Sequence, residues 1–358
     1  MSVQTQIDAL LAPSVGLPGL AGDRAMLDAA LRFGSDGGKR FRPWLFHTCH
    51  QYLTAARGQD SGRRAAHADV LDRVAAAIEL LHTAFVVHDD VIDNDDTRRG
   101  RSSVPGWFAV AAPLGADGEG ERTYARAGGI LAGDLALVAA VRAIATSGAA
   151  PDQTTRLLDL FDEALQDSAA GELADVRLSL DVEVPGIEEA TSVSELKTAA
   201  YSFVLPMKAA AVLSGAGTDV AALVGEIGRS LGIAFQLRDD LWGAFGDAHE
   251  TGKDPLGDLR EGKRTPLIAH AATTRHWWRI QAILGRPDLT AAEGEQIRRT
   301  LVAAGSVAYV ESMMTRHLDH ARHIARALGL EAVIDDLPCT WDTPQVGSAP
   351  SIEGADVA

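Results

Sequence analysis

Residues 66–94, AHADVLDRVAAAIELLHTAFVVHDDVIDN, join a long apolar pattern to a group of carboxylates. Apolar side chains recur at steps of three and four residues through Val74, Ile78, Leu81 and Phe85. This spacing places them along one face of an α-helix, so it predicts one long helix over 66–94. The acidic residues would then sit at the C-terminal end of an apolar helix.

Outside this segment the chain also reads as helices separated by polar turns. Runs of Ala, Leu and Val with interspersed charges favour packed helices over strands. The polar stretches 57–64, 115–122 and 246–264 are expected to be loops, and a loop as long as the last is often functional. We therefore predict an all-α fold, with a single domain over residues 1–337 and a disordered tail over residues 338–358. Further helices are expected at about 42–56, 124–147, 153–181, 193–213 and 217–246.

Composition and charge narrow the class of protein. Of the 358 residues 46% are hydrophobic, and the formal net charge is -16 at pH 7. A nucleic-acid-binding protein should show a basic stripe, and an acidic protein is poorly suited to anionic lipid, so neither partner is expected. Two cysteines provide no disulfide framework, and the N-terminus lacks the features of a signal peptide. Charges break the apolar runs before ~18 residues, so we expect a cytoplasmic protein without a transmembrane segment.

The carboxylates at the end of the first segment suggest a metal site. Asp89 and Asp93 are four residues apart and would share a helix face, with Asp90 one step around. Carboxylates crowded at the end of a buried helix repel one another unless a cation lies between them, and Mg²⁺ commonly bridges carboxylates to phosphates. Arg98 and Arg99 follow at once, and guanidinium groups fit diphosphate oxygens. The alternative interpretation is a solvated helix end with mixed charges.

A second acidic segment, FQLRDDLWGAFGD at residues 235–247, repeats this arrangement. Asp239 and Asp240 lie on an apolar helix pattern, and Lys253 and Lys263 follow in the polar loop. Two such segments that face each other would form a clamp for Mg²⁺ and a diphosphate, with the lysines neutralising the outer oxygens. Alone, the second segment would be interpreted as an ordinary charged helix.

Together the two segments resemble the aspartate-rich motifs of the trans-isoprenyl diphosphate synthase, or polyprenyl synthetase, family. Other segments match that family in chain order, over about residues 37–267 in all. The resemblance implies a single large helical bundle around a deep central cavity, assembled as a homodimer. The further matching segments are Gly37-Gly38-Lys39-Arg40-Phe41-Arg42-Pro43 (G-G-K-R-x-R-P in the family), His82, Gly133-Asp134 and Lys197-Thr198.

The resemblance also implies an activity and a set of functional residues. The activity is that of a Mg²⁺-dependent prenyltransferase, which condenses isopentenyl diphosphate with an allylic diphosphate to give a linear all-trans prenyl diphosphate. Three Mg²⁺ ions per active site are implied, with Asp89, Asp90 and Asp93 on one wall and Asp239 and Asp240 on the other. The implied substrate contacts are Arg98, Lys197, Gln236 and Lys253 for the allylic diphosphate, Lys39, Arg42, His82 and Arg99 for isopentenyl diphosphate, Gly38 and Lys263 beside them, and Thr198 with Gln236 at the reaction centre.

The chain departs from the resembled family at two positions. The second motif of the family has a third aspartate where this chain has Gly243. Asp247, one helical turn further, is expected to serve as the metal ligand in its place. Glu172 stands where the family often has a glutamine after the residue matching Gly171.

Product length would be set on the helix that precedes Asp89. Phe85 lies four residues upstream of Asp89, Ala84 five and Leu81 eight, so a growing prenyl tail must pass these side chains. In the resembled family, bulk at the positions matching Ala84 and Phe85 tunes the product. The expected product is geranylgeranyl diphosphate, with farnesyl diphosphate as the alternative.

Two other functions remain open from the sequence. A class I terpene cyclase also uses an aspartate-rich helix and Mg²⁺, but it does not need the second diphosphate site that Lys39 and Arg42 suggest. A non-catalytic partner subunit should have lost acids or cations, and Gly243 is the one such departure noted here. Three histidines at intervals of three residues are expected to form the polar face of a helix rather than a metal site, namely His317, His320 and His323.

Overall fold

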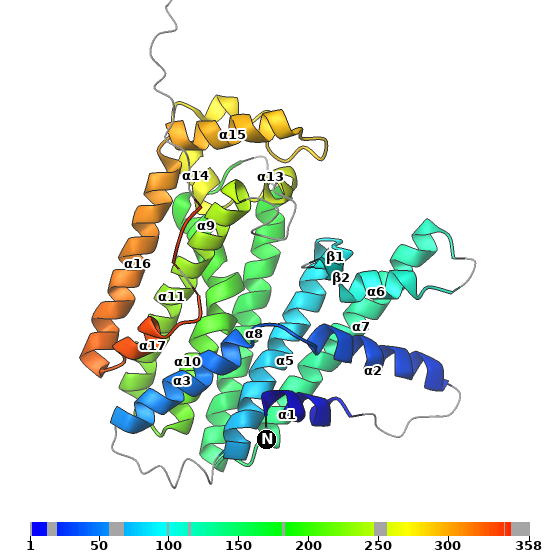
Figure 1. Cartoon of the computed structure of the whole chain (residues 1–358), viewed down its shortest axis with the longest axis vertical. Helices are drawn as coiled ribbons and strands as arrows, with labels where there is room; N and C mark the ends of the chain where they lie inside the picture. The colour runs from blue at the N-terminus through cyan, green and yellow to red at the C-terminus, as the bar shows by residue number, and fades with distance from the viewer. Residues whose placement is uncertain are drawn as a thin grey trace, which may run out of the picture. The chain divides into compact units, whose positions relative to one another are not determined.

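The computed structural model describes residues 2–12, 20–56, 68–98, 100–113, 116–180, 183–246, 256–339 and 341–344. Within these ranges the regular structure is helical, apart from one antiparallel pair of two-residue strands, β1 (Thr97–Arg98) and β2 (Arg101–Ser102). The predicted all-α fold is therefore confirmed (Figure 1).

The helices have the following bounds in chain order: α1 (Val3–Leu10), α2 (Ala21–Ser35), α3 (Phe41–Ala56), α5 (Ala68–Ile92), α6 (Val104–Val110), α7 (Gly118–Ala145), α8 (Pro151–Leu180), α9 (Ile187–Ser194), the π-helix η2 (Glu195–Val204), α10 (Leu205–Leu213), α11 (Thr218–Phe245), α13 (Gly257–Glu261), α14 (Pro266–Ala272), the 3₁₀-helix η3 (Trp277–Arg279), α15 (Ala291–Ala303), α16 (Ser306–Leu328) and α17 (Glu331–Asp335).

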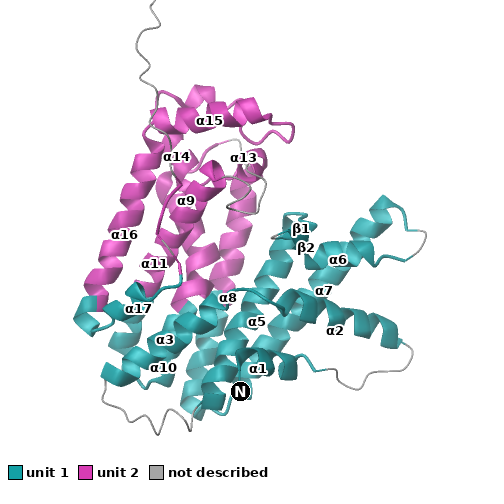
Figure 2. Ribbon diagram, viewed as in Figure 1, with its two compact units in different colours: residues 1–164, 205–225, 326–338 teal, residues 165–204, 226–325, 339–358 magenta. Residues whose placement is uncertain are grey.

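Contacts within the chain group these elements into two compact units, coloured separately in Figure 2. The first unit comprises Met1–Ala164, Leu205–Gly225 and Arg326–Pro338. The second comprises Leu165–Val204, Glu226–Ala325 and the chain from Cys339 onward. Helices α8 and α11 contribute residues to both units. A single domain over residues 1–337 stays a prediction.

Helix α5 is the central element of the first unit. Its residues Ala75, Ala76, Ala77 and Ile78 are all fully buried, because α5 packs against α1, α3 and α7. The helix ends at Ile92, two residues before the predicted end. The turn is nevertheless continued, because the Asp93 N–H donates to the Asp89 carbonyl at 2.9 Å. The carboxylates therefore lie at the end of a helix enclosed by apolar side chains.

The second unit contains a π-helix that the sequence pattern did not predict. The stretch expected as one helix over 193–213 is divided into α9, η2 and α10. Glycines allow the neighbouring helices to approach η2 closely: a Cβ at Gly171 of α8 would lie 2.4 Å from the Lys197 backbone nitrogen. A Cβ at Gly232 of α11 would lie 2.4 Å from the Ala199 Cβ. Because real Cβ atoms do not approach so closely, glycine is required at both positions for this packing.

Other boundaries also differ from the sequence prediction. Helix α7 begins inside the loop expected at 115–122, since the Asp117 side chain accepts a hydrogen bond from the Gly120 N–H at 2.9 Å and caps the helix. The loop at 57–64 lies outside the described residues, as do residues 247–255 of the loop at 246–264. Of the predicted disordered tail, residues 345–358 lie outside the described part. In residues 341–344, Asp342 accepts a hydrogen bond from the Trp242 indole at 3.0 Å.

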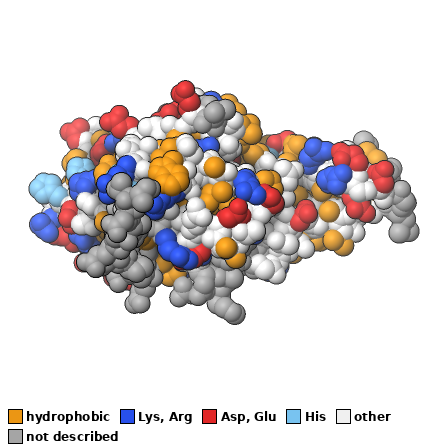
Figure 3. Space-filling view, turned by 90° about the horizontal axis from the view of Figure 1, so that it is seen from above, with side chains coloured by type: hydrophobic (Ala, Val, Ile, Leu, Met, Phe, Trp, Pro, Cys, Tyr) orange, Lys and Arg blue, Asp and Glu red, His pale blue; other side chains and the backbone are white. Residues whose placement is uncertain are grey.

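Within the described ranges, two helices are long and apolar enough to cross a membrane by length and composition. They are α7 and α11, and 44% and 61% of their most apolar windows are buried inside the protein. The core helix of a soluble protein meets the same criterion. On the face drawn in Figure 3, acidic and basic side chains of the described residues are interspersed with apolar ones. Among the described residues visible on this face, side chains of one charge sign do not form a separate patch.

The close contact between α11 and η2 predicts that Gly232→Ala destabilises the protein. The added methyl group would meet Ala199 at 2.4 Å, so backbone must shift, and overpacking of this kind costs about 1–3 kcal/mol of unfolding free energy. Thermal unfolding followed by circular dichroism should show a lower Tm. Gly225→Ala in the same helix is the matched control, because its methyl group would meet only the flexible Lys208 side chain, at 3.2 Å. An unchanged Tm for Gly232→Ala would contradict this account of the packing.

Candidate active site

The first acidic cluster is held by an arginine from the strand pair. Arg98 on β1 places its Nε 2.5 Å from Asp90 Oδ1 and its Nη2 2.6 Å from Asp89 Oδ2. Asp90 is only 2% exposed, whereas Asp93, just beyond the helix end, is exposed. The strand pair therefore brings a cation to the two carboxylates of the last turn of α5. This ion-pair role for Arg98 was not anticipated from the sequence.

Burial and charge oppose each other at Asp90. Burial raises its pKa to about 6, although the guanidinium of Arg98 lowers it, and the carboxylates of Asp89 and Asp95 add to the rise. At Arg98, burial by itself would lower the pKa, but Asp90 and Asp89 together raise it above its usual range. A cation beside Asp90 favours its charged form, as Arg98 does here, and Mg²⁺ has the oxygen preference and charge to act in the same way.

Two consecutive hydrogen bonds connect Thr198 to the second acidic cluster. Thr198 Oγ1 in η2 donates to Gln236 Oε1 at 2.8 Å, and Gln236 Nε2 donates to Asp240 Oδ1 at 2.9 Å. Asp240 is 7% exposed, and its Oδ2 has no hydrogen-bond partner among the described residues. Asp239 is more exposed and pairs with Arg238 at 2.7 Å. The structure therefore links Thr198 and Gln236, which the resemblance placed together at the reaction centre, to Asp240, which it assigned as a metal ligand.

Asp240 is the most strongly perturbed acid of this cluster. Burial raises its pKa to about 8; the hydrogen bond from Gln236 lowers it, and the charges of Asp258, Asp239 and Asp175 raise it. A buried carboxyl group with an unpartnered oxygen and acidic neighbours is stabilised in its charged form by a bound cation. The donor set of the second cluster therefore also fits Mg²⁺.

Lys197 lies in η2 between two carboxylates of α8. Its Nζ is 2.8 Å from Asp175 Oδ2 and 3.0 Å from Glu172 Oε2. Glu172 is one of the residues that depart from the resembled family, and in the structure its side chain contacts Lys197. The carboxylate at 172 adds a second acidic partner to the lysine expected to contact a diphosphate.

The acidic clusters are not preassembled metal cages. Among the residues that the structure describes, no three His, Cys, Asp or Glu side chains converge closely enough to hold a metal ion. This is compatible with Mg²⁺, which typically binds one or two carboxylates, keeps several waters and takes its remaining ligands from substrate phosphates.

The predicted substrate-binding residues lie at several places in the described chain. Lys39 is exposed and Arg42 half-buried, after Gly37 and Gly38 with positive φ angles of 79° and 78°. Both glycines adopt the left-handed conformation that residues with side chains avoid. His82 lies half-buried on α5.

Three predicted residues fall outside the described part of the chain. They are Arg99, expected to bind isopentenyl diphosphate, Lys253, expected to bind the allylic diphosphate, and Asp247, expected to replace the third aspartate of the second motif. Lys263 is described, and its Nζ lies 3.2 Å from Asp258 Oδ1 and 3.0 Å from Glu261 Oε2.

The residues expected to control chain length are all on α5. Leu81 and Ala84 are buried, and Phe85 is half-buried one turn before Asp89.

The sequence did not predict the contact that holds the loop containing Gly37 and Gly38 to helix α5. There, the Arg40 Nη1 lies 2.8 Å from Glu79 Oε1. A buried glutamate on an apolar helix face was the one signal that could have indicated it.

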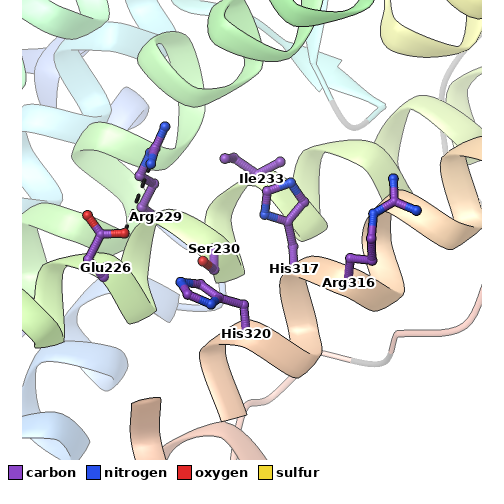
Figure 4. Close-up of a pocket in the computed structure, with 7 residues that line it drawn as sticks. All are labelled: Glu226, Arg229, Ser230, Ile233, Arg316, His317 and His320. Atoms are coloured by element: carbon purple, nitrogen blue, oxygen red, sulfur yellow. Dashed lines mark ion pairs between the residues drawn. The ribbon is translucent and has the colours of Figure 1, made fainter. Parts of the chain in front are cut away.

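A pocket of about 330 Å³ lies between α11 and α16, and two of the three recurring histidines line it (Figure 4). His317 has a lowered pKa because it is buried and faces the cations Arg229 and Arg316. Arg229 is itself neutralised by Glu195 at 2.5 Å. Glu226 is the one carboxylate in the described lining of this pocket, which therefore lacks the clustered carboxylates of the candidate site. The full lining is Glu226, Arg229, Ser230, Ile233, Arg316, His317 and His320.

The chain is similar to known proteins over most of its length. The Polyprenyl synthetase family matches residues 24–301. A geranylfarnesyl diphosphate synthase of Aeropyrum pernix is 31% identical over 299 residues, which cover 83% of this chain and 85% of that protein. A geranylgeranyl diphosphate synthase of Sulfolobus acidocaldarius is 31% identical over 252 residues, 70% of this chain and 68% of that protein.

A solved structure gives the same family. The geranylgeranyl pyrophosphate synthase of Corynebacterium glutamicum, complexed with isoprenyl diphosphate and magnesium, superposes with a TM-score of 0.81 at 27% identity. The superposition covers 92% of this chain and 95% of that one. The resemblance inferred from the aspartate-rich motifs is thereby confirmed, and the chain belongs to the polyprenyl synthetase family, the trans-isoprenyl diphosphate synthases.

Proposed function

We propose that this protein is a Mg²⁺-dependent prenyltransferase that joins isopentenyl diphosphate to an allylic diphosphate and releases a linear prenyl diphosphate. The observation that carries the proposal is the pair of buried aspartates, Asp90 and Asp240, each near the end of a long apolar helix and beside further acids. Such groups are costly to bury unless a cation compensates them. Membership of the family supports the same reaction.

The reaction needs a leaving group stabilised as its charge grows. Asp89, Asp90 and Asp93, and separately Asp239 and Asp240, would hold Mg²⁺ ions, three in all, on the allylic diphosphate. When bound, Mg²⁺ neutralises charge on the departing diphosphate. The allylic carbon–oxygen bond breaks with its electron pair on the diphosphate, the isopentenyl double bond forms the new carbon–carbon bond, and the released diphosphate takes the proton.

The chain's own residues would position and protect the reacting groups. Thr198 and Gln236 are fixed to each other by the 2.8 Å hydrogen bond, so their oxygen dipoles are oriented before substrate binds. Lys197, with Arg98 and Lys263, would contact the diphosphate of the allylic substrate. Lys39, Arg42 and His82 would hold isopentenyl diphosphate, which leaves its double bond to react. Apolar walls exclude water that would otherwise capture the allylic cation.

The proposed product is geranylgeranyl diphosphate. The similar proteins include geranylgeranyl and geranylfarnesyl diphosphate synthases, so related chains make products of twenty carbons or more. On α5, Ala84 is small and buried, and Phe85 is large and half-buried one turn before Asp89. Phe85 is therefore the proposed floor against which the tail stops, and farnesyl diphosphate is the alternative product.

The proposed assembly is a cytoplasmic homodimer. Helix α7 has exposed apolar side chains at helical spacing, among them Leu131, Leu135 and Val138, and Val138 is 64% exposed. A stripe of this kind is unusual on the free surface of a monomer. A second copy of the chain would cover it, because a two-fold axis sets the same stripe of two copies face to face.

The first prediction of the proposed function concerns the reaction itself. With labelled isopentenyl diphosphate and dimethylallyl, geranyl or farnesyl diphosphate in turn, the protein should form a linear product only when Mg²⁺ is present. Asp90→Asn should lower kcat by ~100-fold or more, since it removes a ligand needed in the transition state. Asp96→Asn, an exposed acid in the same segment, is the matched control and should change kcat little. If the folded protein incorporated no labelled isopentenyl diphosphate, the result would contradict the proposed reaction and favour a terpene cyclase or a non-catalytic subunit.

The second prediction concerns chain length. Phe85→Ala removes the aromatic ring that would stop the tail, so the product should lengthen by at least one five-carbon unit. Chromatography of the dephosphorylated products measures this directly. Phe33→Ala on α2 is the control and should leave the product length as it is. An unchanged product from Phe85→Ala would show that Phe85 is ordinary packing.

The third prediction concerns the α7 stripe. Val138→Glu places a charge at its centre and should raise the dissociation constant of the dimer by ~30-fold or more. Analytical ultracentrifugation measures the two species. Val110→Glu on α6 makes the same change at a residue that is 87% exposed and outside the stripe, and it should leave the dimer intact. A dimer unaffected by Val138→Glu would place the interface elsewhere, and a monomeric wild type would reject the assembly.

A further inference from the structure

The space that a side chain at Gly243 would fill is occupied by the carboxylate of another residue. Gly243 lies four residues after Asp239 and three after Asp240, so all three share one face of α11. A Cβ built at Gly243 would lie 1.9 Å from Asp258 Oδ2. The Asp258 carboxylate, carried by the short helix α13, therefore occupies the place where a side chain at 243 would begin.

The orientation of Asp258 leaves one oxygen directed at this helix face. Its Oδ1 lies 3.2 Å from Lys263 Nζ, while Oδ2 is the atom that lies over Gly243. Neighbouring positions on one helix face have Cβ atoms about 5–6 Å apart. Oδ2 consequently lies about one helical turn from the Cβ positions of Asp239 and Asp240.

A second observation points to a ligand at this face. Asp240 is more than nine-tenths buried, and its Oδ2 has no hydrogen-bond partner in the described part of the chain. Buried carboxylate oxygens are rarely left unsatisfied, because the lost hydration is costly. Asp240 belongs to the helix face to which Asp258 brings its carboxylate, so a cation at this face would compensate both acids.

We propose that Asp258 is a metal-binding residue, which supplies the third carboxylate of the second acidic cluster where the chain carries glycine. This inference rests on the proposed function, because it assigns a ligand to one of the Mg²⁺ sites of that reaction. It also identifies a described residue for the role that the sequence had assigned to Asp247. Glycine at 243 is then required, since any side chain there would displace Asp258.

The test measures metal binding without turnover. Mn²⁺ accepts the same oxygen ligands as Mg²⁺, and its free form is counted by electron paramagnetic resonance in the presence of inorganic diphosphate. Asp258→Ala should raise the dissociation constant of the affected Mn²⁺ class by ~10- to 100-fold. Asp240→Asn should raise it similarly, and the double variant should bind no more weakly than Asp240→Asn alone, because both residues serve one ion.

Four further variants complete the experiment, one of which, Asp247→Asn, tests the ligand expected from the sequence. Glu261→Gln is the matched control, because Glu261 contacts the same lysine from the same helix at 3.0 Å, and it should bind Mn²⁺ as the wild type does. Asp258→Ala with Gly243→Asp should restore binding, since the Cβ atoms at these two positions would lie 3.9 Å apart, an ordinary contact. Asp258→Asn, which keeps the shape of the side chain, replaces Asp258→Ala if the latter is unfolded by circular dichroism.

The outcomes separate this inference from the proposed function. Mn²⁺ binding within twofold of wild type in Asp258→Ala overturns it, and so does an equal loss in Glu261→Gln. A loss in Asp247→Asn but not in Asp258→Ala assigns the ligand to Asp247 instead. Loss of Mn²⁺ binding in Asp258→Ala together with a wild type that makes no prenyl product would reject the function and keep the ligand. Product formation with unaltered Mn²⁺ binding would do the reverse.

Discussion

The cost of burying a carboxylate governs this structure. Asp90 is withdrawn from water at the end of α5, and Asp240 is withdrawn in the same way near the end of α11. Each helix is apolar because it forms part of a core, so the acids at its end lose hydration that only a partner can replace. Among the described residues, that partner is Arg98 for Asp90 and the amide of Gln236 for Asp240. Burial is the largest cause at both acids and raises the pKa of Asp240 to about 8 and that of Asp90 to about 6, while the charge of Arg98 lowers the pKa of Asp90.

Close packing in the second unit makes the hydrogen-bonded chain at Asp240 possible. Glycine at 171 and at 232 lets α8 and α11 approach the backbone of η2, and this approach sets Lys197 against α8 and Thr198 against Gln236. A π-helix places its side chains in an angular order that a regular α-helix does not provide, which is one reason such turns recur at functional sites. The positions of Lys197 and Thr198 in η2 thus depend on glycine, which has no side chain, at positions 171 and 232 of the neighbouring helices.

At the two positions where this chain departs from its family, 172 and 243, the structure shows a specific contact. Glu172 adds a second carboxylate to Lys197, so this lysine is held more firmly than a single acid would hold it. Gly243 admits the Asp258 carboxylate to the face of α11. Glu172 adds a carboxylate beside Lys197, and Asp258 provides a carboxylate where a side chain at 243 would begin. The proposed diphosphate site therefore keeps its acidic character. A non-catalytic relative would be expected to lose such charge instead.

The sequence by itself determined the all-α class, the position of both acidic clusters and the family, because helical periodicity and short motifs are local properties of the chain. It predicted the long helix that ends near Asp89 to within two residues. Only the tertiary structure decided that Arg98 pairs with Asp89 and Asp90, that η2 is a π-helix, and that Asp258 lies over Gly243. The physical reason is that each of these depends on how closely segments distant in sequence approach, and packing sets that distance. A missing side chain at 243 is visible in the sequence, but the carboxylate that occupies its place is visible only in the fold.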